Sequence, residues 1–283
     1  MATPRNLTTA LLSAILAAGT TAAWAGPTGY AAWDLDGTDK LVRFNLATGA
    51  GTVLGDIHTS GGTGFTDIDG LAFDGSGRLW AVDDATNTLM RLDTTTGAAT
   101  VVGSMGSGLG ANFGLAFGSG GALYMSADTK LYSVNTTTAA ATLVGSFSND
   151  LKVRSLGYYG GTLFGWSSID TLVAIHPTTA AATTIGSLGF VPEAGGRDGM
   201  DADPATGTLW GLGDFEARTY TIDAQTGMAT VVAQQVCWQG GVANPNCSGG
   251  GFNGLAIAAV PEPGAALLLS AGLAVLALRR RRT

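Results

Sequence analysis

Charged residues are scarce in this 283-residue chain, and basic residues are the scarcest of them. Only 12% of the residues are charged, lysine occurs three times, and the net charge is −7. An acidic surface with so few lysines excludes nucleic acid as a partner, because phosphates need a basic surface. Low charge can also indicate disorder, but the 46% hydrophobic content with regularly placed aromatic residues predicts a packed all-β domain.

Histidine and cysteine are nearly absent, which limits metal and redox chemistry. His58 lies in a predicted loop on one face and His176 in a predicted turn on the other, so they are not expected to share a metal. Cys237 and Cys247 flank a Gly/Asn/Pro-rich segment without the spacing of a zinc pair. In an oxidising compartment we expect a disulfide between them, worth about 2–3 kcal/mol in the chain-entropy model.

Apolar runs without charge occur at the two ends of the chain. Near the N-terminus, Arg5 precedes the apolar stretch 11–23, and Ala23-Trp24-Ala25 fits the small-x-small cleavage rule. Residues 1–25 are therefore predicted to be a signal peptide. The body, residues 26–259, has the length of one domain.

The C-terminal run follows two prolines and ends in four arginines. Residues 265–278 form an uncharged stretch of 14, whereas a stable bilayer crossing needs about 20. Pro261 and Pro263 stop a helix from extending backwards, and the positive-inside rule keeps the arginines in the cytoplasm. These properties alone leave an ordinary membrane anchor and a sorting signal equally open.

The tail, residues 260–283, resembles the PEP-CTERM sorting signal of Gram-negative bacteria, and all three parts of that signal are present in order. The resemblance implies export by the Sec machinery, a short transmembrane helix used at least transiently, and processing by an exosortase. It implies a location at the cell surface or outside the cell in a bacterium that makes exopolysaccharide. It says nothing about activity. The residues that match the signal are Pro261, Glu262, Pro263, Arg279, Arg280, Arg281 and Arg282.

The body repeats itself about every forty-odd residues. Each repeat holds four short apolar runs bounded by Gly, Asp, Asn or Thr, typical of antiparallel strands joined by tight turns; we name them A to D. Four strands per repeat of this length predict a β-propeller blade. Strand A carries a glycine in most repeats, as expected for a strand that lines the crowded central channel. The aromatic marker of strand B is Trp33, Trp80, Tyr124, Phe164 or Trp210.

Five copies of each marker predict an all-β, five-bladed β-propeller. The body opens on a strand B at 30–33 and closes on a lone strand A at 254–258. We therefore expect velcro closure, in which the last strand completes the first blade and removes the open edges of the sheet.

Candidate ligand residues gather on the face that holds the D–A and B–C loops. Asp69, Arg154, Asp198 and Asn253 are predicted at the channel mouth, two residues before each strand-A Leu or Met. A second interpretation is that the aspartates only cap turns. No resident cofactor is expected, but Ca²⁺ stays open because hard cations bind carboxylates. The candidate metal ligands are Asp34, Asp36, Asp39, Asp83 and Asp84.

The sequence offers no motif of an activated nucleophile, and nothing in it singles out one pair of carboxylates for glycoside hydrolysis. We therefore expect a non-catalytic binding or structural protein of the cell surface or extracellular matrix, with extracellular polysaccharide as a candidate partner. The alternative is a propeller hydrolase or lyase that acts on polysaccharide.

Overall fold

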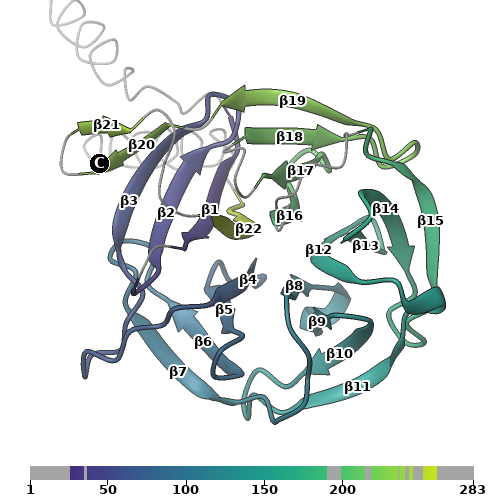
Figure 1. Cartoon of the computed structure of the whole chain (residues 1–283), viewed down its shortest axis with the longest axis horizontal. Helices are drawn as coiled ribbons and strands as arrows, with labels where there is room; N and C mark the ends of the chain where they lie inside the picture. The colour runs from purple at the N-terminus through teal and green to yellow at the C-terminus, as the bar shows by residue number, and fades with distance from the viewer. Residues whose placement is uncertain are drawn as a thin grey trace, which may run out of the picture.

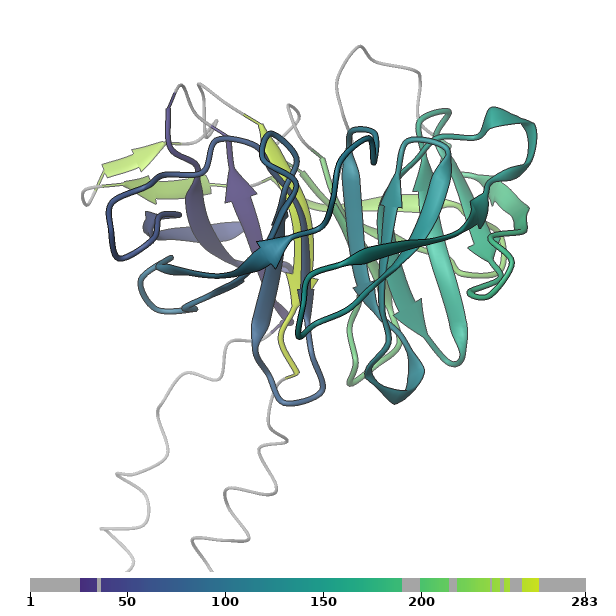
Figure 2. The ribbon, with the colours of Figure 1, turned by 90° about the horizontal axis from the view of Figure 1, so that it is seen from below.

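Five β-sheets stand around a central axis in the computed structural model (Figure 1). The structure describes residues 26–34, 37–189, 199–213, 218–234, 236–239, 242–244 and 251–259. The chain is therefore an all-β, five-bladed propeller, as the repeat predicted. Viewed from the side, the ring is seen edge-on (Figure 2).

Each blade runs from an innermost strand A to an outermost strand D. Blade 1 takes strands from both ends of the described chain: β22 (Phe252–Ile257), β1 (Thr28–Trp33), β2 (Lys40–Asn45) and β3 (Ala50–Asp56). Blade 2 holds β4 (Ile68–Phe73), β5 (Leu79–Asp83), β6 (Thr88–Leu92) and β7 (Ala99–Ser104). Blade 3 holds β8 (Phe113–Phe117), β9 (Leu123–Ala127), β10 (Lys130–Val134) and β11 (Ala141–Ser146).

The last two blades follow the same order. Blade 4 holds β12 (Val153–Tyr159), β13 (Thr162–Ser167), β14 (Thr171–Ile175) and β15 (Ala182–Ser187). Blade 5 holds β16 (Gly199–Ala202), β17 (Leu209–Leu212), β18 (Arg218–Ile222) and β19 (Ala229–Gln234). Two 3₁₀ turns, Ser119–Gly121 and Ser148–Asp150, lie between strands.

The predicted closure is confirmed at blade 1. Strand β22 pairs antiparallel with β1, so that Ile257 faces Gly29 and Phe252 faces Trp33 (Figures 1 and 2). The ring of Phe252 lies 6.0 Å from that of Trp33 and 5.1 Å from that of Phe44. These aromatic contacts add to the burial of apolar surface at the seam.

The structure corrects the aromatic marker of blade 1 from Trp33 to Tyr30. Tyr30 pairs with Arg43 on strand C, as Trp80 pairs with Arg91 in blade 2. Trp33 pairs with Lys40, near the other end of its strand. Tyr30, not Trp33, is therefore the equivalent of Trp80.

A hairpin that the repeat did not predict covers the outer edge of blade 1. After β19, the chain forms β20 (Val236–Gln239) and β21 (Val242–Asn244) before it returns to the axis as β22. Strand β20 pairs parallel with β3, which makes this sheet six-stranded. The pairing shields the backbone of β3, an edge that would otherwise be open.

Glycines let the innermost strands approach one another closely. A Cβ on Gly114 of blade 3 would lie 2.8 Å from the Cα of Ser155 in blade 4. A Cβ on Gly70 of blade 2 would lie 2.7 Å from the carbonyl oxygen of Phe113 in blade 3. The crowded centre expected from the glycines of strand A is therefore confirmed.

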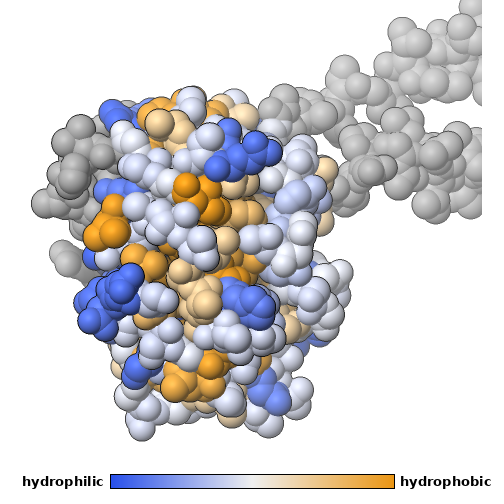
Figure 3. Space-filling model, turned by 90° about the vertical axis from the view of Figure 1, so that its right-hand side faces the viewer, coloured by the Kyte–Doolittle hydropathy of each residue, from blue (hydrophilic) through white to orange (hydrophobic). Residues whose placement is uncertain are grey.

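Outer strands meet end to end along much of the rim. The carbonyl that follows one blade's strand D accepts a backbone hydrogen bond from the start of the next strand D, as in Ala99 N–H to His58, Ala141 N–H to Met105 and Ala229 N–H to Leu188. On the side of the rim seen in Figure 3, exposed apolar side chains form separate small groups. Such scattered groups are ordinary for a folded domain.

The expected signal peptide and the tail with its short transmembrane helix lie outside the described residues. Cys237 lies on β20, but Cys247 is also outside them, so the disulfide stays a prediction. Within the described part of the chain, no helix has the length and apolar character needed to cross a bilayer.

Candidate functional site

The residues predicted at the channel mouth lie on or just before the innermost strands, at the end of the ring that carries the D–A loops. Asp69 is on β4, Arg154 on β12 and Asn253 on β22, while Asp198 lies outside the described residues. The Oδ2 atom of Asp69 accepts a hydrogen bond from the backbone N–H of Phe113 at 3.0 Å. Asp69 therefore joins blade 2 to blade 3.

Below this mouth the channel is closed by side chains. Gly70, Leu71, Gly114, Leu115, Met200 and Leu255 are among the residues that line it, and they leave no room for a water molecule. A ligand at this mouth would rest on the rim and could not enter the channel from that side.

Carboxylates of the acidic B–C loops accept hydrogen bonds from backbone N–H groups of loops. Asp39 Oδ2 accepts the N–H of Ile68 at 2.8 Å, which joins blade 1 to blade 2. Asp84 Oδ2 accepts the N–H of Asn112 at 3.0 Å, which joins blade 2 to blade 3. Asp83 accepts the N–H of Thr86 at 2.9 Å. These contacts favour a structural role for the carboxylates of Asp39, Asp83 and Asp84 on this face.

One of these carboxyl groups is strongly desolvated. Asp39 has no exposed surface, and its Oδ1 has no hydrogen-bond partner among the described residues. Burial raises its pKa to about 7, and the negative charges of Asp34, Asp67 and Asp83 add to the increase. Burial also raises the pKa of Asp67 and of Asp84.

The calcium candidates do not assemble within the described chain. Asp34, Asp39, Asp83 and Asp84 are described and Asp36 is not. Among the described His, Cys, Asp and Glu side chains, no three are placed to hold one metal ion. The two histidines lie apart: His58 in the loop after β3 and His176 in the turn after β14.

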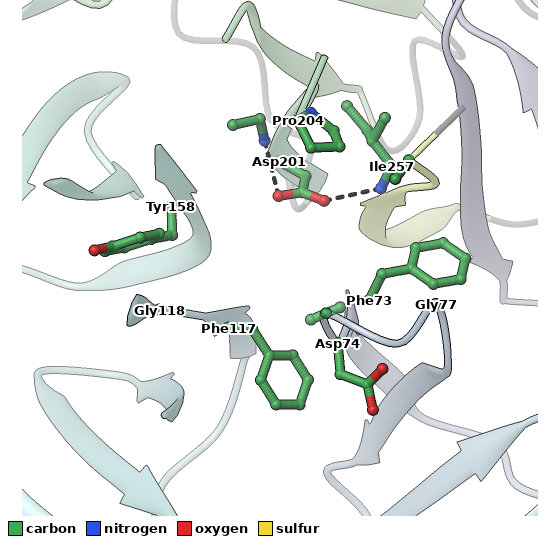
Figure 4. Close-up of a pocket in the computed structure, with 13 residues that line it drawn as sticks. Phe73, Asp74, Gly77, Phe117, Gly118, Tyr158, Asp201, Pro204 and Ile257 are labelled. Carbon is green, nitrogen blue, oxygen red and sulfur yellow. Dashed lines mark hydrogen bonds between the residues drawn. The ribbon is translucent and has the colours of Figure 1, made fainter. Parts of the chain in front are cut away.

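A pocket opens at the other end of the ring, where the A–B turns lie. It has a volume of about 290 Å³ and takes lining residues from all five blades, so it lies on the axis. Its apolar side chains include Phe73, Phe117, Tyr158 and Ile257, and its carboxyl groups are Asp74 and Asp201 (Figure 4). Ala259, the last described residue of the chain, also lines it.

Aromatic contacts between blades fix two of the pocket's rings. Phe73 of blade 2 packs edge-on against Tyr30 of blade 1 with ring centroids 5.4 Å apart. Phe117 of blade 3 packs in the same way against Trp80 of blade 2 at 6.0 Å. The aromatic residue of strand B thus positions the pocket residue of the next blade, which explains why both recur in the repeat.

Asp201 stands on β16, with its carboxylate at the edge of the opening (Figure 4). Its Oδ1 accepts the N–H of Ala202 and its Oδ2 accepts the N–H of Ile257, both at 2.8 Å. Burial raises the pKa of Asp201 to about 7 in spite of these two hydrogen bonds, and the charge of Asp203 adds to the increase.

The second carboxylate of the pocket is already neutralised. Asp74 Oδ2 accepts hydrogen bonds from Arg78 Nε at 2.7 Å and from Trp80 Nε1 at 2.9 Å, and Oδ1 accepts from Ser76. These contacts hold the pKa of Asp74 well below its usual range although desolvation opposes them. In Figure 4 its carboxylate points away from Asp201.

The repeat pattern predicts a ligand site at the opposite mouth and does not predict this pocket. A signal for it was nonetheless present. The residue after the strand-A Leu or Met is small in four blades and acidic in blade 5: Ala72, Ala116, Gly157, Asp201 and Ala256. A departure from a repeat at one position marks a residue that the fold itself does not require.

Comparison with known proteins supports the fold alone. No protein-family model matches the chain, and no curated protein matches it. Among solved structures, it is similar to a structural genomics protein of unknown function from Bacteroides thetaiotaomicron VPI-5482, with 14% identity and a TM-score of 0.52. The match covers 82% of this chain and 70% of the other, so the two chains share their overall architecture.

Proposed function

We propose that this protein is an exported, non-catalytic binding module that acts at the cell surface or in the extracellular matrix. The export motifs at the two ends of the sequence support the route. The signal peptide would direct Sec export, and the Pro-Glu-Pro tail would present the protein to an exosortase. Both partners follow from the resemblance of the tail to PEP-CTERM signals.

The observation that carries the binding role is the axial pocket at the A–B end. Its volume of about 290 Å³ is close to the lower limit of small-molecule sites, which combine apolar walls with a few fixed polar groups. Aromatic surface packs against the apolar face of a sugar ring, and a carboxylate accepts hydrogen bonds from hydroxyl groups. We propose that the ligand is polyhydroxylated, such as a sugar residue of an extracellular polysaccharide.

A binding role agrees with how the carboxylates are used. Hydrolysis of a glycosidic bond needs two carboxyl groups about 5–9.5 Å apart that are free to act on the substrate. In the pocket, Asp74 is held by Arg78 and Trp80, which leaves Asp201 without a free carboxyl partner among the described lining residues. On the other face, Asp39, Asp69 and Asp84 accept hydrogen bonds from backbone N–H groups of neighbouring blades.

One observation favours the alternative, a hydrolase or lyase of polysaccharide. A carboxyl group with a pKa near neutrality is suited to general acid or base catalysis, and burial raises the pKa of Asp201 to about 7. The two functions therefore differ in whether Asp201 only holds the ligand or also transfers a proton.

The test combines binding and turnover on the mature exported protein. Immobilised polysaccharide fragments would report binding, and product masses after long incubation would report turnover. We expect binding without new products, and binding weakened in Asp201→Ala but unchanged in Asp223→Asn, at an exposed C–D turn outside the pocket lining. Turnover by the native protein that Asp201→Asn abolishes would replace the binding module with the enzyme.

A further inference from the structure

Asp201 occupies a position where the other four blades show that the fold accepts a small residue. It pairs with Trp210 on strand B, as Ala72 pairs with Trp80 and Ala116 with Tyr124. The backbone geometry is therefore that of the repeat, and only the side chain differs. The repeat does not require a carboxylate at this position, and desolvating one is costly, so Asp201 points to a ligand in addition to its contact with blade 1.

The orientation of this carboxylate is fixed by two different blades. The N–H of Ala202 belongs to its own strand, and the N–H of Ile257 belongs to β22 of blade 1. Each oxygen holds one backbone donor and keeps further acceptor capacity, because a carboxylate has about four lone-pair sites. The group is thus preorganised and still able to accept hydrogen bonds from a bound molecule.

No cation in the described pocket neutralises Asp201. The pocket-lining residues include no lysine, arginine or histidine. The titratable groups around it are Asp203 on its own loop, Asp74 in the β4–β5 turn and the phenol of Tyr158 on β12. The neighbouring part of β22 contributes the Ile257 N–H but no charged side chain. Asp201 therefore faces negative or neutral groups, unlike Asp74 with its Arg78.

The aromatic walls favour the same kind of ligand. Phe73, Phe117 and Tyr158 line the pocket, and the faces of such rings attract cations. In Figure 4 the Tyr158 side chain extends away from Asp201, with its hydroxyl group at the far end, so its polar atom does not point to the carboxylate. The net charge of −7 also raises the local concentration of cations around the protein.

We propose that the pocket at the A–B end binds a small ligand that carries an ammonium group, such as an amino sugar, with Asp201 as its counter-ion. This inference rests on the proposed binding function and names its ligand class. The ammonium group donates hydrogen bonds to the carboxylate and lies against the aromatic side chains, while hydroxyl groups face the open end. N-acetylation of the amine removes its charge, so the acetylated sugar is expected to bind more weakly.

The first experiment compares two sugars that differ in one group. The mature protein is titrated calorimetrically with methyl glucosaminide and with methyl glucoside, in which a hydroxyl replaces the amine. We expect the amine to bind at least ten times more tightly. Asp201→Ala, which installs the residue found in three other blades, should reduce this preference to within about twofold, whereas Asp223→Asn, at an exposed turn, should keep it.

The second experiment uses pH with a ligand whose charge is permanent. Choline has a permanent charge but no N–H to donate, so it tests the ionic part of the interaction alone. It and its uncharged carbon analogue dimethylbutanol are titrated from about pH 5 to about pH 8. Ligand binding requires the ionised carboxylate, so choline affinity should rise nearly tenfold per pH unit until the pKa of Asp201 is passed and then level off. Dimethylbutanol affinity should stay flat, and Asp201→Asn should flatten the choline curve.

The outcomes separate the two proposals. Equal affinity for methyl glucosaminide and methyl glucoside, or an amine preference that persists in Asp201→Ala, overturns the ammonium ligand and leaves a sugar-binding module. If neither small sugar nor any polysaccharide fragment binds, both proposals fail. Unfolding midpoints of each variant are measured first. If Asp201→Ala fails to fold, Asp201→Asn, which keeps the size of the side chain, takes its place.

Discussion

At the residue scale, the rim aspartates combine structural contacts with unfavourable charge. Asp39 accepts the N–H of Ile68 through one oxygen, while its other oxygen is buried without a partner. The fold therefore favours the protonated form, whose pKa of about 7 lies above the ordinary value of 3.8. The stabilisation by this proton is complete below about pH 4 and is lost as pH rises through 7.

Replacing Asp39 by Asn should remove this pH dependence. The amide oxygen can still accept the Ile68 N–H, and no charge is buried at any pH. At about 1.4 kcal/mol per pKa unit, the variant should gain up to about 4 kcal/mol over the native protein between pH 4 and pH 8. Urea unfolding at several pH values measures the difference.

The matched control is Asp93→Asn, at an exposed turn where blade 3 already carries Asn135. Hydrogen bonds from Thr95 lower the pKa of Asp93. Its stabilisation is present at neutral pH and is lost as pH falls through the lowered pKa, the opposite direction from Asp39. A difference between Asp39→Asn and the native protein that does not change with pH contradicts the buried-proton explanation.

Some residues of the candidate site could be predicted and others could not. The sequence predicted that Asp69, Arg154 and Asn253 would lie at the starts of innermost strands, because they stand at a fixed distance from each strand-A Leu. The same comparison of repeats places Asp201 where the other blades carry alanine or glycine. The burial of its side chain and its contact with Ile257 depend on two blades that are distant in sequence. Local pattern does not report such contacts.

At the scale of elements, turns and strands follow the repeat closely. The C–D turns begin with Asn45, Asp93, Asn135, His176 and Asp223. In each turn, the side chain of this first residue accepts backbone N–H groups. The turn chemistry was predictable because it depends on neighbours in sequence.

Two elements were not predicted for physical reasons. The hairpin β20–β21 comes from a Gly/Asn/Pro-rich region that reads as a loop, and it is a pair of strands through contact with β3. The aromatic marker of blade 1 was ambiguous because Tyr30 and Trp33 both lie on β1. Only the pairing of Tyr30 with Arg43 decides which of them matches Trp80.

The contact between innermost strands gives a prediction at this scale. Gly114→Ala places a methyl group 2.8 Å from the Ser155 Cα and 3.0 Å from the Arg154 carbonyl oxygen. Backbone of a neighbouring blade cannot move away as a side chain can, so we expect a loss of about 1–3 kcal/mol in the free energy of unfolding. Chemical denaturation of the purified variant measures this loss.

Gly75→Ala is the control for this prediction, since a Cβ there meets nothing within 4 Å and the residue does not have a positive φ. This change should leave stability unaltered or slightly raised. Equal effects of the two substitutions would show that close approach of the innermost strands does not require glycine.

At the scale of the whole molecule, the ring itself was predictable. The first repeat lacks its own strand A, and a lone strand A ends the last one, so the five repeats can form few closed arrangements. Pairing β22 with β1 is the arrangement that leaves no blade incomplete. The depth of the pocket was not predictable, because it depends on how five strand ends converge. No single repeat contains that information.

The proposed export route gives the prediction for the whole chain. Changing Pro261, Glu262 and Pro263 together to alanine should block processing, because the exosortase would no longer recognise the tail. We expect the intact mass of the membrane fraction to include the terminal arginines, while the native protein appears without them. Identical masses for the variant and the native protein, with a Thr283→Ala control beside them, would remove the PEP-CTERM route.

The position of Ala259 has a further consequence for access to the pocket. Strand β22 runs along the axis and ends at the A–B mouth, so the polypeptide leaves the ring at the rim of the cavity. If the tail anchors the protein as proposed, a tether attached through this exit would keep the cavity on the side of the envelope and the opposite mouth on the side of the medium. An anchored molecule would then sample material close to its own cell, whereas a released one would meet soluble glycans from every direction.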